Sequence, residues 1–167
     1  MINQGTNHYL LTGDLEESGE AHLVDYYEQH HGGLPKCVLF KGGHHGSVTS
    51  SSDKLLDVIT PEYVCVCTCC GTSEYTDNSS TQFVTQEFIN RVSKHTENVY
   101  VTTMVDNYVS KDEWEDLGTV KSMNGNIVFA VNNGVITINC SNNNTKLKDT
   151  QWFKDNRTCP TNWQESA

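Results

Sequence analysis

Two short segments of this chain carry side chains that can hold a metal ion. Asp14 follows the apolar run 8–12, and the pair His44 and His45 follows the apolar run 37–40. Carboxylate and imidazole are the ligand types that zinc and related divalent ions accept. In layered α/β folds, ligands gather at the carboxyl ends of strands. Flanking glycines let each backbone turn sharply there, so the sequence indicates a candidate metal site.

Simpler explanations exist for both segments. Asp14 and Glu17 form a D-x-x-E pattern, which resembles a capping box that only starts a helix. The histidine pair alone is compatible with an ordinary turn. The joint occurrence of both features at strand ends, with a helix between them, is what favours a site, and both interpretations stay open. Glu16, Glu17 and Glu20 are expected to form a solvated first helical turn, where carboxylates suit the helix dipole.

The pattern of apolar residues predicts an α/β fold with helices packed on a sheet. Four strands are expected, at 8–12, 37–40, 63–69 and 99–105, the third of them buried on both faces. Helices are expected at 19–30, with Leu23, Tyr26 and Tyr27 facing inward, after the hydroxyls of 50–52, and at 81–95. Asn132-Asn133-Gly134 between two apolar runs predicts a C-terminal β-hairpin. Residues 141–167 form a polar C-terminal extension after a domain spanning 1–140, with Trp152, Phe153 and Trp163 as docking points.

The composition limits the partners. The chain has 167 residues, 21 acidic against 11 basic residues and a net charge of −10. Contacts from Lys and Arg to phosphates dominate nucleic-acid affinity, and no basic cluster is present. A nucleic-acid partner would therefore have to be held by a metal or by another domain. No apolar stretch approaches the ~20 residues that span a bilayer, and no secretory signal is visible, so we expect a cytoplasmic protein or a soluble domain of a larger one.

The seven cysteines are an odd number, and four of them lie in one apolar run at 65–70. This pattern predicts reduced thiols and not a disulfide framework. Alternation along a strand would place Cys65, Cys67 and Cys69 on one face as small core residues. Cys69 and Cys70, at the end of the strand, are expected to be the more reactive thiols.

The segments Leu10–Glu16 (LLTGDLE) and Gly42–Ser47 (GGHHGS), followed by Thr49–Ser52 (TSSS), resemble paired blocks of ComEC-type hydrolase domains of the metallo-β-lactamase superfamily. The resemblance is specific from residue 9 to about 69. It implies the C-terminal half of an αββα fold, a mixed sheet with helices packed on it. It also implies that Asp14 bridges two metal ions, zinc or manganese. His44 is the expected histidine ligand because it comes first after the strand; His45 is the fallback, and Ser47 and Thr49 line the rim.

The chain departs from this family in its ligands. It has no H-x-H-x-D-H motif, which in the family precedes the region matched here. A catalytic zinc normally keeps three protein ligands, and Asp14 with one histidine supplies two. The stretch at 73–77 also replaces an Asn-x-Tyr-x-His-Pro motif of the relatives. The resemblance therefore implies a fragment that lacks the N-terminal half of its domain and is inactive alone.

In the intact parent, the implied reaction is metal-assisted hydrolysis, with phosphodiesters of nucleic acid as the leading substrate, as in competence and DNA uptake. Two alternatives remain: a non-catalytic interaction or regulatory module, and a hydrolase of small esters or lactones.

Overall fold

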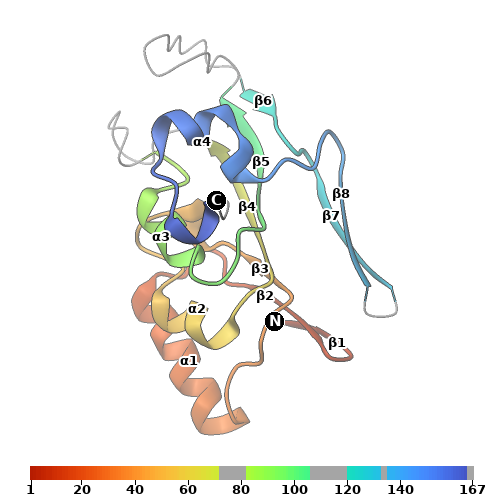
Figure 1. Cartoon of the computed structure of the whole chain (residues 1–167). Coiled ribbons are helices and arrows are strands. Elements are labelled where there is room, and N and C mark those ends of the chain that lie inside the picture. Colours follow the sequence, from red (N-terminus) through yellow and green to blue (C-terminus); the bar gives the residue numbers. More distant parts are fainter. Residues whose placement is uncertain (72–81, 106–119, 133–134, 165–167) are drawn as a thin grey trace.

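The computed structural model describes residues 1–71, 82–105, 120–132 and 135–164, and a six-stranded sheet forms its centre (Figure 1). The strands follow one another in chain order: β1 (Ile2–Gln4), β2 (Asn7–Leu11), β3 (Leu39–Lys41), β4 (Tyr63–Cys70), β5 (Val99–Val105) and β6 (Val120–Ser122). β2 to β5 are parallel, whereas β1 and β6 pair antiparallel at the two edges. The four predicted strands are confirmed; β1 and β6 were not predicted.

The helices lie on one side of this sheet and a two-stranded hairpin lies on the other (Figure 1). The helices are α1 (Glu17–His31), α2 (Asp53–Ile59), α3 (Gln86–Val92) and α4 (Gln151–Asn156). The hairpin consists of β7 (Ile127–Asn132) and β8 (Val135–Cys140). Tyr63 of β4 and Phe129 of β7 meet edge to face, with ring centroids 5.6 Å apart. The mixed α/β architecture with a C-terminal hairpin agrees with the prediction.

The core lies between the sheet and the helices. Every second residue of the central strands faces the helices and is fully buried, as Phe40, Val64 and Val66 are. The matching residues of α2 and α3, Leu55, Leu56, Ile59, Phe88, Ile89 and Val92, are also fully buried. Burying apolar surface in this way is the main force that holds the helices on the sheet.

Some predicted helix details were wrong. α1 begins at Glu17, and Tyr26 on this helix is 53 % exposed, because the buried side of α1 is formed by Glu20 and Val24. α3 begins at Gln86 and not near 81, because the Thr85 hydroxyl accepts the Phe88 amide and caps the helix there. α2 has the expected cap, since the Ser52 hydroxyl accepts the Leu55 amide.

The expectations for the cysteines of β4 were partly wrong. Only the face of β4 that points to the helices is buried throughout; on the opposite face Cys65 is buried but Cys67 is exposed. Cys70 is fully buried, and burial raises the pKa of its thiol to about 12. Burial also raises the pKa of Cys69. The thiolate is the reactive form of cysteine, so a raised pKa makes Cys69 and Cys70 less reactive than expected. The exposed thiol of this strand is Cys67.

The C-terminal segment packs back on the domain. Leu147, Trp152, Phe153 and Trp163 belong to the same buried cluster as the sheet residues. The Trp163 indole donates to the Thr96 carbonyl at 2.9 Å. The docking points expected in 141–167 are thus part of the core.

Three predicted features lie outside the described residues: most of the polar loop 71–80 with the stretch 73–77, the loop 111–118, and residues 133–134 of the hairpin turn. No helix in the described part of the chain is long and apolar enough to cross a membrane.

Candidate functional site

The two strand ends that carry Asp14 and the histidine pair are adjacent. β2 and β3 are parallel neighbours with Leu11 opposite Lys41, so the segments that follow them leave the same edge of the sheet. The His44 amide donates to the Gly13 carbonyl at 3.0 Å and joins the two segments directly. The predicted juxtaposition is therefore present, and it follows from the parallel order of the strands.

The histidines occupy a tight left-handed turn. His44 has φ 41° and ψ 51°, and His45 has φ 57° and ψ 19°. Non-glycine residues rarely adopt positive φ, at a cost of ~1–2 kcal/mol each, so the surroundings must hold this turn in place. Gly46 follows with φ 79°, and a Cβ atom there would lie 2.6 Å from a Val84 methyl carbon. Only glycine fits that position.

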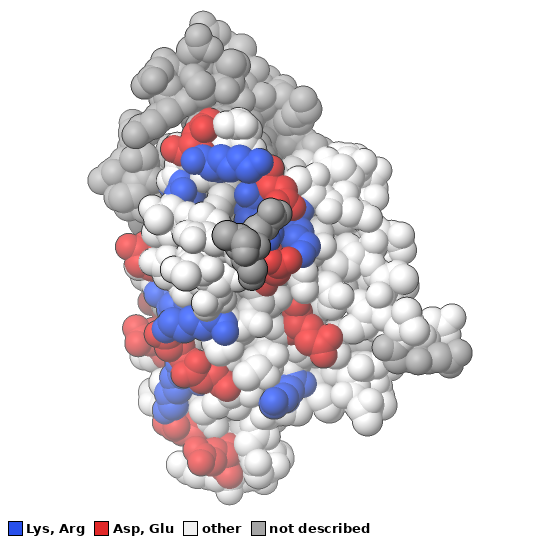
Figure 2. All heavy atoms as spheres, viewed as in Figure 1, with Lys and Arg blue, Asp and Glu red and all other residues white. Residues whose placement is uncertain are grey.

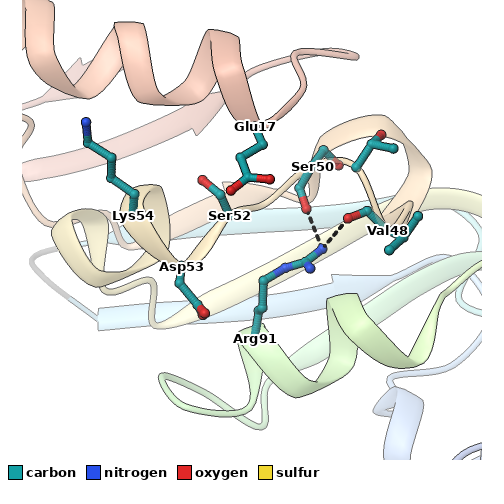
Figure 3. Close-up of a pocket in the computed structure, with 8 residues that line it drawn as sticks. Glu17, Val48, Ser50, Ser52, Asp53, Lys54 and Arg91 are labelled. Atoms are coloured by element: carbon teal, nitrogen blue, oxygen red, sulfur yellow. Dashed lines mark hydrogen bonds between the residues drawn. The ribbon is translucent and has the colours of Figure 1, made fainter.

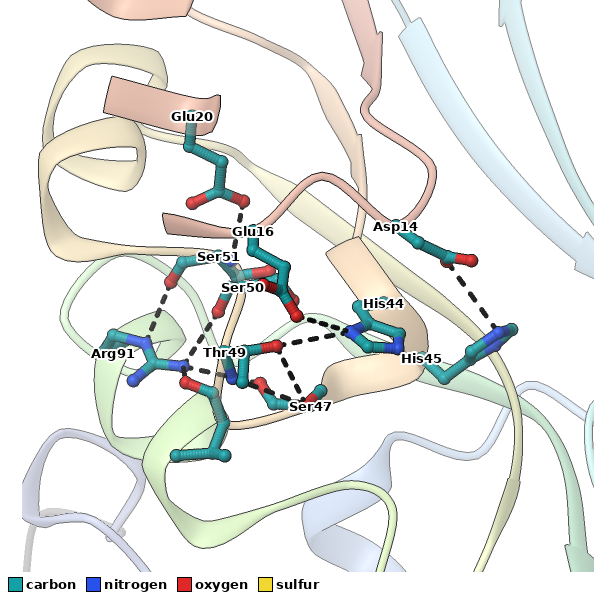
Figure 4. A network of polar contacts seen from close by, with 11 residues as sticks. Asp14, Glu16, Glu20, His44, His45, Ser47, Thr49, Ser50, Ser51 and Arg91 are labelled. Atoms are coloured by element: carbon teal, nitrogen blue, oxygen red, sulfur yellow. Dashed lines mark hydrogen bonds and ion pairs between the residues drawn. The ribbon is translucent and has the colours of Figure 1, made fainter. Parts of the chain in front are cut away.

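His45 lies beside Asp14 (Figure 4). Its Nδ1 is 2.7 Å from the Cys67 carbonyl oxygen. A carbonyl can only accept, so Nδ1 carries the hydrogen and Nε2 of the neutral ring keeps its lone pair. That Nε2 is 3.9 Å from Asp14 Oδ1, and the two side chains are 46 % and 65 % exposed. Both donor atoms are thus accessible and close together.

His44 points to different partners. Its Nδ1 is 3.2 Å from the Thr49 hydroxyl and 3.8 Å from a Glu16 carboxylate oxygen. The Ser47 hydroxyl lies 3.3 Å from the Thr49 hydroxyl, and Ser47 is buried, whereas Thr49 is exposed. The five predicted site residues are therefore clustered. His45, the fallback in the prediction, has its Nε2 beside Asp14, and which histidine binds a metal stays a prediction.

Asp14 does not cap the helix that follows. The residue before the first turn of α1 is Glu16, and no side chain caps this helix. The capping-box explanation of Asp14 and Glu17 is thus wrong. Asp14 instead lies in the short connection between β2 and α1, where its carboxylate is exposed beside His45.

Sequence reasoning missed two charged residues behind the turn. Glu20, expected in a solvated turn, is fully buried, and its carboxylate accepts the amides of Ser51 and Ser52 at 2.7 Å each. Arg91 of α3 donates to the carbonyls of Val48, Ser50 and Ser51 at 2.8–3.0 Å. The only available signal was the position of Glu20 four residues before the buried Val24, on the inner side of α1.

A polar hollow lies on the other side of the same loop (Figure 3). It is lined by Glu17, Val48, Thr49, Ser50, Ser52, Asp53, Lys54 and Arg91. Lys54 is paired with Asp25, and Asp53 is paired with Lys94. Acidic and basic groups alternate along the helical side of the molecule, as Figure 2 shows, while the hairpin side is uncharged. This view shows no basic surface for a nucleic-acid backbone.

The donor set fits part of a metal site. In the described part of the chain no three His, Cys, Asp or Glu side chains are grouped to hold an ion. Asp14 and His45 nevertheless have the right chemistry, and two ligands of a tetrahedral zinc with bonds of about 2.1 Å stand roughly 3.4 Å apart. The observed 3.9 Å is near that spacing. The arrangement of ring and carbonyl at His45 is the one that usually orients a metal-binding imidazole.

Fold and site together describe an α/β domain with a carboxylate–imidazole pair at the carboxyl edge of its parallel strands. The chain is similar to the competence protein ComA of Neisseria gonorrhoeae, with 50 % identity over 54 residues, which is 32 % of this chain and 7 % of that protein. The chain thus spans a small part of the length of this relative. No family model matches the sequence, and no solved structure matches it. This similarity supports the relationship to ComEC-like competence proteins, whereas membership of the metallo-β-lactamase superfamily stays a prediction.

Proposed function

We propose that this chain supplies part of the metal site of a metal-dependent hydrolase that serves DNA uptake. The observation that carries the proposal is the Asp14–His45 pair, with its two donor atoms 3.9 Å apart and the ring held by the Cys67 carbonyl. The similarity to a competence protein supports the biological setting. Phosphodiester bonds of nucleic acid are the proposed substrate, by analogy alone.

Within this proposal, Asp14 and His45 hold the metal, zinc or manganese, and His44 is the alternative ligand. Bound metal would supply an activated water at neutral pH and stabilise negative charge on the reacting centre. The protein groups act on the ligands: the Cys67 carbonyl fixes the ring orientation of His45, and the Thr49 hydroxyl contacts Nδ1 of His44. Thr49 contributes a hydroxyl at the rim, whereas Ser47, predicted to do the same, is buried and lies with its hydroxyl 3.3 Å from that of Thr49.

Under the same proposal, the metal needs further ligands besides the two that the described residues supply. Two ligands are fewer than the three of a catalytic zinc. We propose that the N-terminal half of the parent domain brings them, and that it packs on the side of the sheet away from the helices, where Cys67 is exposed. The chain alone is then expected to be inactive.

Metal binding tests the first step. We would titrate the purified chain with Zn²⁺ and with Mn²⁺ by calorimetry, together with Asp14→Asn, His45→Gln, His44→Gln and His22→Gln. Two protein ligands predict weak binding that falls at least ~10-fold in the Asp14 and His45 variants. His22→Gln is the matched control, because it removes an exposed imidazole of α1 that belongs to neither strand-end segment. His44→Gln tests the alternative ligand. Absence of binding, or binding that ignores both substitutions, would sink the proposal.

Activity tests the second step. The chain alone should not hydrolyse a phosphodiester, and the longer parent protein should. A panel of esters and lactones beside the phosphodiester separates a nuclease from a small-molecule hydrolase. If the parent protein hydrolyses none of them but binds a partner through this region without metal, the chain is an interaction module.

A further inference from the structure

The Asp14–His45 pair depends on a backbone turn that is unfavourable on its own. Two consecutive non-glycine residues, His44 and His45, have positive φ, and such residues persist only where the surrounding structure over-determines them. Within the turn, the Ser47 amide donates to the His44 carbonyl at 2.9 Å. At its start, the Gly43 amide donates to the Ser51 hydroxyl at 3.1 Å. The Ser51 contact connects the turn to the loop behind it.

Ser51 uses every polar group that it has. Its hydroxyl accepts the Gly43 amide, its own amide donates to Glu20, and its carbonyl accepts from Arg91 at 2.9 Å. Ser51 is fully buried and has φ 58°, a third strained position in the same region. Its hydroxyl can therefore reach Gly43 only while the two charged side chains hold its backbone.

Glu20 and Arg91 hold the loop from two sides, as Figure 4 shows. Glu20 accepts the amides of Ser51 and Ser52, and Arg91 donates to the carbonyls of Ser50 and Ser51 on the opposite side of the same two peptides. A buried carboxylate is costly unless its oxygens are satisfied, and here each oxygen accepts a backbone amide. Hydrogen bonds with a charged partner are roughly twice as strong as neutral ones. The loop thus has one favoured hydrogen-bond arrangement.

The same contacts connect the two segments of the site. Asp14 precedes α1, and Glu20 lies in the first turn of α1. The loop that Glu20 binds is the one whose Ser51 fixes Gly43 and the histidine turn. Movement of α1 relative to the loop would therefore change the separation of Asp14 and His45.

We propose that Glu20 and Arg91 are positioning residues which, acting through Ser51, hold the 43–46 turn so that His45 Nε2 faces Asp14. The role of this turn in metal binding rests on the proposed function, whereas the orientation of the His45 ring can be measured without metal. Neither residue touches a metal or a substrate under this proposal. Their effect is on the orientation of the His45 ring.

The test measures the His45 ring in the metal-free chain. Long-range ¹H–¹⁵N spectra above neutral pH report which ring nitrogen carries the hydrogen. In the unmodified chain we expect His45 to hold the hydrogen on Nδ1, because of the Cys67 carbonyl. Glu20→Gln places an amide NH₂ group against a backbone N–H, so we expect the turn to relax and His45 to average over both tautomers. Zn²⁺ affinity should fall ~10–100-fold, as for other residues that orient a metal ligand.

Two controls separate positioning from stability. Glu28→Gln makes the same charge change on an exposed position of α1 and should leave the His45 spectrum unchanged. Leu147→Ala removes a fully buried side chain from a short helical turn that packs on β5, so it should lower stability but keep the His45 tautomer. Arg91→Lys acts from the other side of the loop and is the second variant if Glu20→Gln does not fold. It should shift the tautomer in the same direction.

An unchanged Nδ1–H tautomer in folded Glu20→Gln and Arg91→Lys would overturn the inference and leave these residues a purely structural role. Equal averaging in Leu147→Ala would overturn it as well. If the unmodified chain binds no Zn²⁺, the proposed function fails, but the tautomer measurement still decides the positioning role.

Discussion

Gly46→Ala tests whether the turn of the site is held by the close packing that the structure shows. Gly46 has φ 79°, and a Cβ atom there would lie 2.6 Å from Val84 Cγ1 and 3.3 Å from Val84 Cβ. Val84 is fully buried, and its carbonyl accepts from Arg157 at 2.8 Å, so this segment cannot move away without losing contacts. The Gly46 carbonyl also accepts both the amide and the hydroxyl of Thr85 at 3.0 Å, which ties the turn to the start of α3.

The cost of Gly46→Ala has two sources. A left-handed backbone with a Cβ costs about 1–2 kcal/mol. Overpacking a filled core costs typically about 1–3 kcal/mol. We therefore expect a loss of about 2–5 kcal/mol in the free energy of unfolding, which for a chain of this size lowers Tm by roughly 2–4 °C per kcal/mol.

A double-mutant cycle separates the two sources. Val84→Ala removes the methyl groups that the new Cβ would meet, so in that background Gly46→Ala should cost only the backbone contribution. The expected coupling between the two substitutions is about 1–3 kcal/mol. Urea unfolding followed by fluorescence of the buried Trp152 and Trp163 gives all four free energies. A cost below ~1 kcal/mol for Gly46→Ala, or strictly additive costs, would refute the packing described here.

Three further predictions concern the rest of the domain. Hydrogen bonds from two lysines lower the pKa of Glu97 to about 2. The stabilising contribution of Glu97 is therefore present above the unfolded pKa near 4.5 and is lost as pH falls through about 2. Glu97→Gln should lower the free energy of unfolding by under ~1 kcal/mol at neutral pH, because the Glu97 side chain is 42 % exposed. The reasoning fails if that difference persists at pH ~2. Cys67 should react with a thiol reagent in the native chain well before Cys70, because burial raises the pKa of Cys70 to about 12. Mass mapping of the modified residues gives the order of reaction, and modification of Cys70 first would contradict the prediction. Trp163→Ala should lower the free energy of unfolding in denaturant by ~3–5 kcal/mol, whereas Val128→Ala, at an exposed position, should lower it little. Similar losses for the two variants would place the C-terminal segment outside the core.

Much of the fold followed from patterns within single segments. Alternating apolar strands and amphipathic helices predicted β2 to β5 and a hairpin near 127–138, because burial repeats with the period of each element. The edge strands were missed because an exposed strand has no alternation of buried and exposed residues. β1 is exposed at all three residues and has no burial pattern to read.

The sequence predicted the residue types of the candidate site, but not which of the two histidines lies beside Asp14. The parallel order of β2 and β3 brings Asp14 to the histidines, as expected from strand ends. The choice between the histidines depends on two positive φ angles and on the Cys67 carbonyl, which is 22 residues away from His45. No local pattern encodes a hydrogen bond of that range.

The sequence by itself determined that Asp14 and a histidine pair stand at neighbouring strand ends, because periodicity and glycines are local properties. Only the tertiary structure decided that His45 faces Asp14 and that Glu20 is buried against Ser51 and Ser52, 31 and 32 residues further along the chain. The physical reason is the same in both cases. The partner that satisfies a buried polar group is set by which segments pack together, and that choice is made only when the whole chain has folded.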